Sequence, residues 1–514
     1  MYSNRRKTLQ TVLPLFDFKV PFSGALDAEN RWVKLATLIP WDAVEADYCR
    51  HFGDTGNDAY PARMALGALI IKERLRLTDE ETVAQLRENP YLQYFIGLKE
   101  YTTNAPFDAS LMVHFRSRIT PELLVRINEL MCAPKAKPDK KKDEDAKPPS
   151  NAGRLIIDAT CAPEDMRHPT DVGLLNDARE HAERVIDQLW ASGDRKSRKP
   201  RTYRRKARKQ YLQTIRRRHA PKSHIRRGIR QQLGFLRRNL RTIDHFPGNV
   251  SPLVLSAQDY KKLLVASEIY RQQSVLYGMF DQQHRRIEDR IVSLSKPHVR
   301  PIVRGKASAD VEFGAKVSVS VIGGKSYVDR ISWDAYNEST DLQKQVESFK
   351  ARTGSYPESV HADRIYRTRD NLRWCQAKGI RLSGPPLGRP PVEESERDLL
   401  RRQQRLDERI RIEIEGKFGT AKRRYALDRI MTKLQRTSET TIVLVFLVMN
   451  LDKILRDLLL SLLEWLLQRR VNQTAGIAFD PTYPNYGKLF RKPEIERQSA
   501  TLKQCELICC LLCG

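Results

Sequence analysis

The feature that most constrains the fold is a short aliphatic segment that ends in a single acidic residue. Residues 155–157 are Leu-Ile-Ile, Asp158 follows, and small residues come next. This pattern predicts a buried strand whose last residue presents a carboxylate at the strand end. Segment 359–363 repeats the pattern and ends in Asp363, and strand and helix patterns alternate from residue 309 onward. The sequence therefore predicts α/β layering around one sheet.

The charge of the chain points to a polyanionic partner. The 514 residues carry a formal net charge of +28, which favours nucleic acid as the partner, with a basic membrane-surface protein as the alternative. This length predicts two or three domains. The N-terminus lacks the long apolar run of a signal peptide, and segment 441–451 is too short to span a bilayer. The scattered cysteines favour a reducing compartment, so we expect a cytoplasmic protein without a membrane partner.

The first part of the chain is expected to be helical. Helix patterns follow one another in 60–119, with Pro61 at one helix start and a capping box in 78–81. Short helices joined by tight turns suit a DNA-binding module of the helix-turn-helix kind, although a plain helical bundle used for docking or dimerisation has the same pattern. We therefore predict a helical DNA-binding domain in 1–132. Residues 133–151, rich in Lys, Pro and Asp, are expected to form a disordered linker.

A strongly basic block interrupts the α/β part of the chain. Residues 195–241 contain twenty Lys or Arg and no Asp or Glu, with apolar residues interleaved. Helices with one basic face are expected. A solvated surface is the alternative, but such a block repels itself without an anion, which favours phosphate contact. We predict a basic helical insertion at about 177–300. Its expected DNA contacts are Arg204, Arg205, Lys206, Arg216, Arg217, Arg218, Arg226 and Arg227.

A third acid completes a set that suits metal-dependent phosphodiester chemistry. Glu415 lies in a charged helix predicted over 393–422. Three carboxylates can hold two divalent ions, Mg²⁺ or Mn²⁺, because water and phosphate fill the remaining positions. Asp158 would bridge both ions, and Asp363 and Glu415 would bind one each. Many such triples can be drawn among 63 acidic residues, so helix caps and a solvated glutamate are the alternatives.

Two cations near the third acid strengthen this hypothesis. One stripe of the predicted helix contains Arg411, Glu415 and Lys422. The carboxylate is therefore flanked by two potential phosphate contacts. A surface ion-pair ladder would have the same spacing and is the alternative.

The motifs together resemble a known family. Segments 156–160, 169–176, 360–366 and 414–425 are similar to those of DDE-type transposases of bacterial insertion sequences. The resemblance implies an RNase H-like catalytic core, a mixed sheet flanked by helices, with Asp158, Asp363 and Glu415 as its metal-binding residues. Related enzymes often have Tyr, two residues, Arg, three residues, Glu, six residues and Lys here. Arg411, Glu415 and Lys422 fit this spacing, but the Tyr position is Glu408. Glu413 is a nearby acid without a matching Lys.

The resemblance also implies the reaction and the partners. We expect metal-dependent cleavage and strand transfer on double-stranded DNA, at terminal inverted repeats and target sites, by a homodimer in a synaptic complex associated with the nucleoid. The alternatives are an RNase H-like nuclease without strand transfer and an inactive, transposase-derived DNA-binding protein. The catalytic domain is predicted over 152–470. The tail 471–514 has no assigned role, and Cys505, Cys509, Cys510 and Cys513 lack the spacing of a zinc finger.

Overall fold

The protein is described here from a computed structural model. The described residues are 18–20, 24–53, 58–133, 151–193, 198–217, 219–246, 254–282, 287–306, 309–385 and 393–477. The chain divides into two units between Leu455 and Arg456. Everything that positions the site lies in the first unit.

The N-terminal part is helical, as the sequence predicts. Thr78 forms the predicted capping box at the start of α5, since its side chain accepts from the Glu81 amide while Glu81 caps the Thr78 amide. Pro61 directly precedes α4, as expected. The helices are α2 (Arg31–Leu38), α3 (Trp41–Tyr48), α4 (Ala62–Leu75), α5 (Asp79–Glu88), α6 (Pro90–Phe95), α7 (Leu111–Arg118) and α8 (Pro121–Cys132).

The described residues of the following part form a six-stranded mixed sheet. Its strands are β1 (Arg154–Pro163), β2 (Arg300–Lys306), β3 (Ala309–Ile322), β4 (Lys325–Ser332), β5 (Ser359–His361) and β6 (Arg381–Leu382). β1 lies between β3, to which it is antiparallel, and β5, to which it is parallel. The predicted β3–β4 hairpin is confirmed, and Gly323 and Gly324 supply its turn with positive φ angles of 55° and 77°.

The prediction that Asp158 ends its strand is wrong. β1 continues five residues further to Pro163, because β3 pairs with it as far as Pro163 and Gly314. Gly314 permits this close pairing, since a Cβ at that position would lie 2.1 Å from the Ala162 carbonyl oxygen. Asp158 therefore projects from the middle of a central strand.

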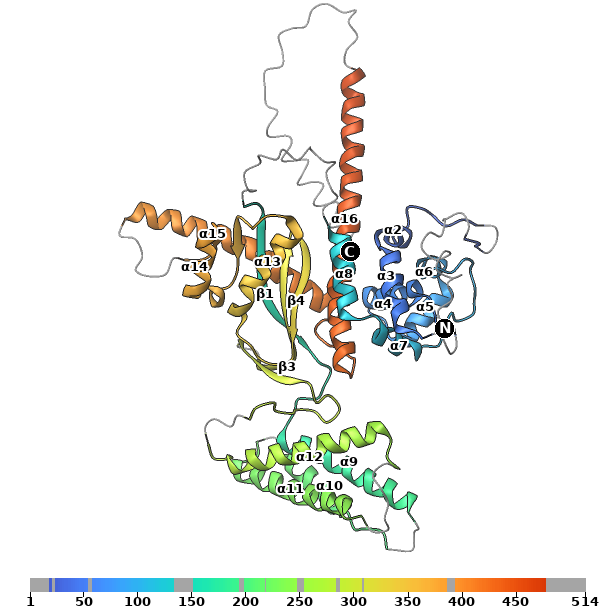
Figure 1. Cartoon of the computed structure of the whole chain (residues 1–514), viewed down its shortest axis with the longest axis vertical. Helices are drawn as coiled ribbons and strands as arrows, with labels where there is room; N and C mark the ends of the chain where they lie inside the picture. The colour runs from blue at the N-terminus through green and yellow to red at the C-terminus, as the bar shows by residue number, and fades with distance from the viewer. Residues whose placement is uncertain are drawn as a thin grey trace, which may run out of the picture. The chain divides into compact units, whose positions relative to one another are not determined.

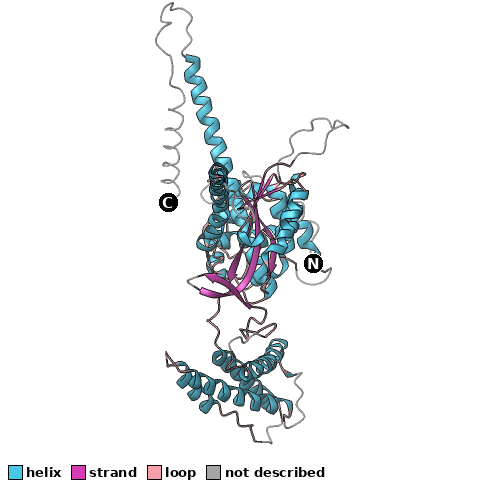
Figure 2. Ribbon diagram, turned by 90° about the vertical axis from the view of Figure 1, so that its left-hand side faces the viewer, coloured by secondary structure: helices cyan, strands magenta, loops and turns pink. Residues whose placement is uncertain are grey.

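Helices cover both faces of the sheet (Figure 2). On one face, Leu155 and Ile157 of β1 pack with α13 (Leu342–Thr353) and α14 (Arg369–Ala377). On the other face, Ile156 packs with α15 (Glu394–Arg424) and α16 (Gln435–Ile477). This alternation is the period-two pattern of a strand that is buried on both sides.

In the described residues between β1 and β2, four helices share a hydrophobic core of their own. They are α9 (Asp171–Ser192), α10 (Arg204–Ile215), α11 (Lys222–Asp244) and α12 (Ala257–Gly278), and Figure 1 shows them packed side by side. Leu175, Leu189, Leu236 and Ile269 belong to this core. The basic residues of the predicted insertion thus lie on helices that bury an apolar face against one another.

The N-terminal helices and the sheet share one hydrophobic core. Asn128 of α8 donates to the Ser326 carbonyl of β4 at 3.1 Å, and Asn450 of α16 donates to Asn128 Oδ1 at 2.8 Å. Arg74 of α4 pairs with Asp452 of α16 at 2.8 Å. These buried polar contacts join segments on either side of the predicted linker. Within the described residues, no helix combines the length and the apolar character needed to cross a membrane.

Candidate active site

The register of β1 and β5 brings two predicted acids to the same part of the sheet. Ile156 lies opposite His361 in this parallel pair, and Asp158 and Asp363 each follow two residues later. Asp158 Oδ1 accepts from the Ala159 amide at 2.8 Å. Asp363 Oδ1 accepts from the Arg364 amide at 2.7 Å and caps the short 3₁₀ turn η6 (Arg364–Tyr366). One of these acids is therefore also a helix cap, which is the alternative that the sequence left open for it.

Helix α15 supplies the third acid. Its buried residues Ile414, Phe418 and Ala421 follow helical spacing and face the sheet, so the helix has one possible orientation about its axis. Glu415 and Arg411 flank this buried stripe. Glu413 lies elsewhere on the helix, since its Oε1 is 3.5 Å from where a Cβ on Gly324 would stand. The helix therefore presents Glu415 and Glu413 to different surroundings.

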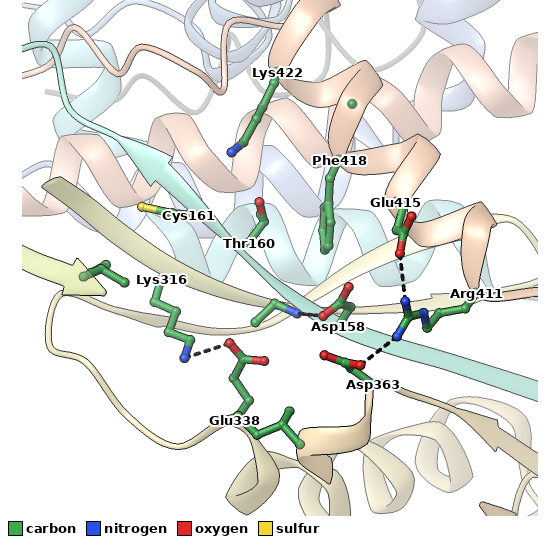
Figure 3. A pocket seen from close by; sticks show the side chains of 14 residues that line it. Asp158, Thr160, Cys161, Lys316, Glu338, Asp363, Arg411, Glu415, Phe418 and Lys422 are labelled. Atoms are coloured by element: carbon green, nitrogen blue, oxygen red, sulfur yellow. Dashed lines mark hydrogen bonds and ion pairs between the residues drawn. The ribbon is translucent and has the colours of Figure 1, made fainter. Parts of the chain in front are cut away.

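The structure brings the three acids and the two flanking cations into one cavity of about 730 Å³ (Figure 3). Asp158, Asp363, Glu415, Arg411 and Lys422 all line it. They come from β1, from the turn after β5 and from α15, so more than 250 residues of sequence separate the first from the last. Glu408, at the position of the family's Tyr, lies instead beside a smaller neighbouring pocket that shares Asp363 and Arg411.

Arg411 connects two of the acids. Its Nη1 donates to Asp363 Oδ1 at 2.8 Å and its Nη2 donates to Glu415 Oε1 at 3.1 Å. Burial lowers the pKa of the Arg411 guanidinium, but the carboxylates of Asp363 and Glu415 outweigh it and leave the pKa raised. The guanidinium thus offsets part of the negative charge of the cavity.

Burial and neighbouring charges shift the pKa of the Asp158 carboxyl. Burial raises the pKa of Asp158 to about 6, the Ala159 amide lowers it, and the carboxylates of Glu338 and Asp363 raise it further. Burial is the largest cause, and the repulsion from these two carboxylates adds to it, although the Arg411 guanidinium lowers the pKa. A divalent cation would relieve this repulsion.

Glu338 is a fourth acid in the cavity that sequence reasoning missed. It begins the 3₁₀ turn η5 (Glu338–Asp341) and pairs with Lys316 of β3 at 2.8 Å. Both residues line the cavity. The preceding Asn337 caps this turn through its side chain, so in sequence Glu338 has the pattern of an ordinary first-turn glutamate. The strand alternation of β3 could have indicated Lys316, because it places a cation on a central strand.

The donor set suits a hard divalent cation. Carboxylate oxygens are the ligands that Mg²⁺ and Mn²⁺ prefer. Within the described residues, no group of three His, Cys, Asp or Glu side chains is already arranged to hold an ion. Arg411 is one reason why the acids are not arranged around an ion, because its guanidinium lies between Asp363 and Glu415. The residues therefore fit a metal once the arginine releases at least one carboxylate.

The predicted DNA contacts of the basic block differ in their surroundings. Arg204 pairs with Asp187 at 2.8 Å, and Arg226 pairs with Asp281 at 2.7 Å and lies over the rings of Tyr277 and Phe280. The remaining described members of the set are exposed: Arg205, Lys206, Arg216, Arg217 and Arg227. Arg204 and Arg205 also line a pocket of about 380 Å³ between α9 and α10. Arg218 and the four tail cysteines lie outside the described residues.

Two protein families match the chain. Residues 360–452 match the family described as Transposase DDE domain, and residues 21–118 match Transposase domain (DUF772). The first match contains Asp363 and Glu415, whereas Asp158 and the helices α9 to α12 lie outside both matches.

A relative in Rhizobium meliloti, described as uncharacterized protein ORF8 in nfe locus, is 31% identical over 154 residues. These residues are 30% of this chain and 72% of the relative. No solved structure matches the chain.

Proposed function

Because the chain belongs to the DDE-type transposases, which bind DNA and use divalent metals, we propose that it cuts and rejoins the ends of an insertion sequence through Asp158, Asp363 and Glu415. The observation that carries the proposal is the convergence of these three acids with Arg411 and Lys422 in one cavity. The order of β4, β3, β1, β5 and β6, with helices on both faces, supports an RNase H-like core.

In this proposal each residue has a defined task. Asp158, Asp363 and Glu415 would hold Mg²⁺ or Mn²⁺. When bound, the ions supply an activated nucleophile and neutralise charge at the phosphorus. Arg411 and Lys422 lie on α15 at the cavity wall and contact the phosphates on either side of the scissile bond. Phe418 lies between these two cations on the helix and limits access of water to the buried side of the cavity.

The proposed reaction has two steps with the same geometry. Water first attacks a phosphorus of the element end, a P–O bond forms while the bond to the bridging 3′-oxygen breaks, and a 3′-hydroxyl is released. That hydroxyl then attacks a phosphorus of the target strand, and the target's own 3′-oxygen leaves. No covalent protein–DNA bond is needed in either step. The acids and cations keep the same tasks in both steps.

The remaining parts of the chain are proposed to hold the DNA. The N-terminal helices bind the element ends, and the exposed cations of α10 and α11 bind adjacent phosphates. Because two ends must be held together for joining, we infer a homodimer in the synaptic complex.

The test is Mg²⁺-dependent nicking and joining of DNA that carries the element's own ends. The proposal expects Glu415→Gln to abolish both activities and to retain DNA binding. Glu413→Gln is the matched control, because it removes an equal charge two residues away on the same helix, and it should keep both activities.

The other outcomes distinguish the alternatives. Nicking without joining by the wild-type protein would favour a nuclease without strand transfer. Tight binding with no cleavage by any variant would favour an inactive DNA-binding protein. Equal cleavage by the wild type and Glu415→Gln would refute the assignment of the third ligand.

A further inference from the structure

Arg411 is the one feature of the cavity whose position conflicts with its proposed task. Both terminal nitrogens of Arg411 donate to acids that are proposed to bind metal, so a phosphate that accepts from these two nitrogens competes with both acids. The two acids come from different elements, 52 residues apart in the sequence. The guanidinium therefore spans the space between two proposed ligands (Figure 3).

Arg411 engages one oxygen of each of two proposed metal ligands. Asp363 Oδ1 accepts from Arg411 and also from the Arg364 amide, so this oxygen already has two donors. Glu415 Oε1 accepts from Arg411 Nη2. The Arg411 guanidinium therefore competes with a divalent ion for these acids. It occupies lone pairs of their oxygens, and its positive charge repels the ion.

The arginine is also placed so that it can leave. Its side chain is 31% exposed, and those of Asp363 and Glu415 are 51% and 53% exposed. Ion pairs with this degree of exposure are weak, because water screens them and long side chains lose rotamer freedom in them. A DNA phosphate in the cavity offers the guanidinium an anionic partner that can accept both of its terminal nitrogens at once. Little free energy is therefore needed to move Arg411 from the acids to DNA.

We propose that Arg411 is a movable counter-ion, which holds Asp363 and Glu415 together before loading, competes with divalent metal for them, and transfers to a DNA phosphate when DNA binds. This inference rests on the proposed function, since it takes the three acids as the metal site. By linkage, DNA that withdraws Arg411 from the acids must increase their affinity for metal, and metal must increase the affinity for DNA by the same factor. The cavity would then bind metal and DNA together more tightly than either alone.

The test is the sign of the change in metal affinity when Arg411 is neutralised. Binding of Mn²⁺ to the full-length protein without DNA is followed through the electron paramagnetic resonance signal of free Mn²⁺. Arg411→Gln should bind Mn²⁺ roughly tenfold more tightly than the wild type, because it removes one positive charge that pairs with two of the proposed ligands. If Arg411 merely positions the acids, the same change must weaken binding or leave it unchanged, and either result overturns the inference.

Two variants serve as controls. Lys422→Gln removes one positive charge from the same cavity and helix without breaking either Arg411 contact, so it should raise the affinity for Mn²⁺ less than Arg411→Gln. Arg411→Lys keeps the charge but lacks the fork that reaches two carboxylates at once, so an intermediate affinity is expected. Circular dichroism verifies the fold of each variant, and Arg411→Lys decides the question if Arg411→Gln does not fold.

A second measurement tests the coupling. A short DNA duplex of mixed sequence, with its own Mn²⁺ binding subtracted, should increase the affinity of the wild-type protein for Mn²⁺. This increase should be largely lost in Arg411→Gln. An equal increase in both proteins would mean that DNA supplies metal ligands itself, which overturns the transfer of Arg411.

The proposed function and this inference fail in different ways. If Asp158→Asn and Glu415→Gln leave Mn²⁺ binding unchanged, the acids are not the metal site and the proposed function is wrong. If those variants lose Mn²⁺ binding while Arg411→Gln does not gain it, the metal site stands and only the role of Arg411 as counter-ion is refuted.

Discussion

The contribution of the basic block to DNA binding can be measured from its dependence on salt. Four exposed cations around α10 are suitable targets, namely Arg205, Lys206, Arg216 and Arg217. Arg204 and Arg226 are left intact, because they already pair with Asp187 and Asp281. Replacing the four targets by Gln removes charge without opening the core of α9 to α12.

The size of the effect follows from counterion release. Each phosphate contact changes the slope of log K against log salt by about −0.9 on duplex DNA. If each of the four cations contacts one phosphate, the slope of the variant should be less negative by about 3.6. Between 50 and 200 mM salt, the wild type should then lose roughly a hundredfold more affinity than the variant.

The assay is fluorescence anisotropy of a labelled duplex at several salt concentrations. A matched control replaces Lys261, Lys262 and Arg271 of α12 by Gln, where Asp259 and Glu268 already offset the charge. We expect this control to change the slope by less than 1. An unchanged slope in the quadruple variant would refute a DNA path across α10. Circular dichroism verifies that the loss of Arg216, at the C-terminal end of α10, has not unwound the helix.

Two further predictions concern buried charges. Burial raises the pKa of Glu73 from 4.5 to about 7, so the stability that its protonated form contributes is fully present below pH 4.5 and is lost as the pH rises through 7. Urea denaturation should show a loss of roughly 3 kcal/mol in the free energy of unfolding, most of it between pH 5 and 8. Glu73→Gln should abolish this pH dependence, and equal pH profiles of the variant and the wild type would contradict the reasoning. Lys296→Met leaves the fully buried carboxylate of Glu164 without its cation and should destabilise the protein by about 3 to 5 kcal/mol. The double variant Lys296→Met with Glu164→Leu should recover most of the lost stability in the same assay. A double variant as unstable as the single one would show that the ion pair itself is required.

Local patterns predicted much of the fold because their causes are local. The capping box at Thr78 and Glu81 needs only four residues, and the β3–β4 turn needs two glycines with positive φ. The long helix that carries Glu415 follows from its own charge spacing. Such elements form as predicted wherever nearby residues determine the backbone.

The end of β1 could not be predicted in the same way. Ala159 and Thr160 have no strong strand pattern after Asp158, and the strand continues because β3, about 150 residues later, supplies a partner. The absence of a Cβ at Gly314 makes that pairing possible, and no feature near Asp158 shows it. Strand length in a central strand is thus a property of the sheet rather than of the segment.

The candidate site likewise combines features that the local sequence determines with features that depend on tertiary packing. Periodicity alone places Arg411 beside Glu415, because four residues make about one helical turn. Asp158 lies near Asp363 because each follows the paired residues Ile156 and His361 by two positions. The contact between Arg411 and Asp363 joins these two halves, and it depends on how α15 packs against the sheet. Glu338 lines the same cavity from η5, although its sequence has only the pattern of a capped turn. The acids could therefore be predicted one by one, whereas the pairing of Arg411 with two of them arises only when α15 meets the turn after β5.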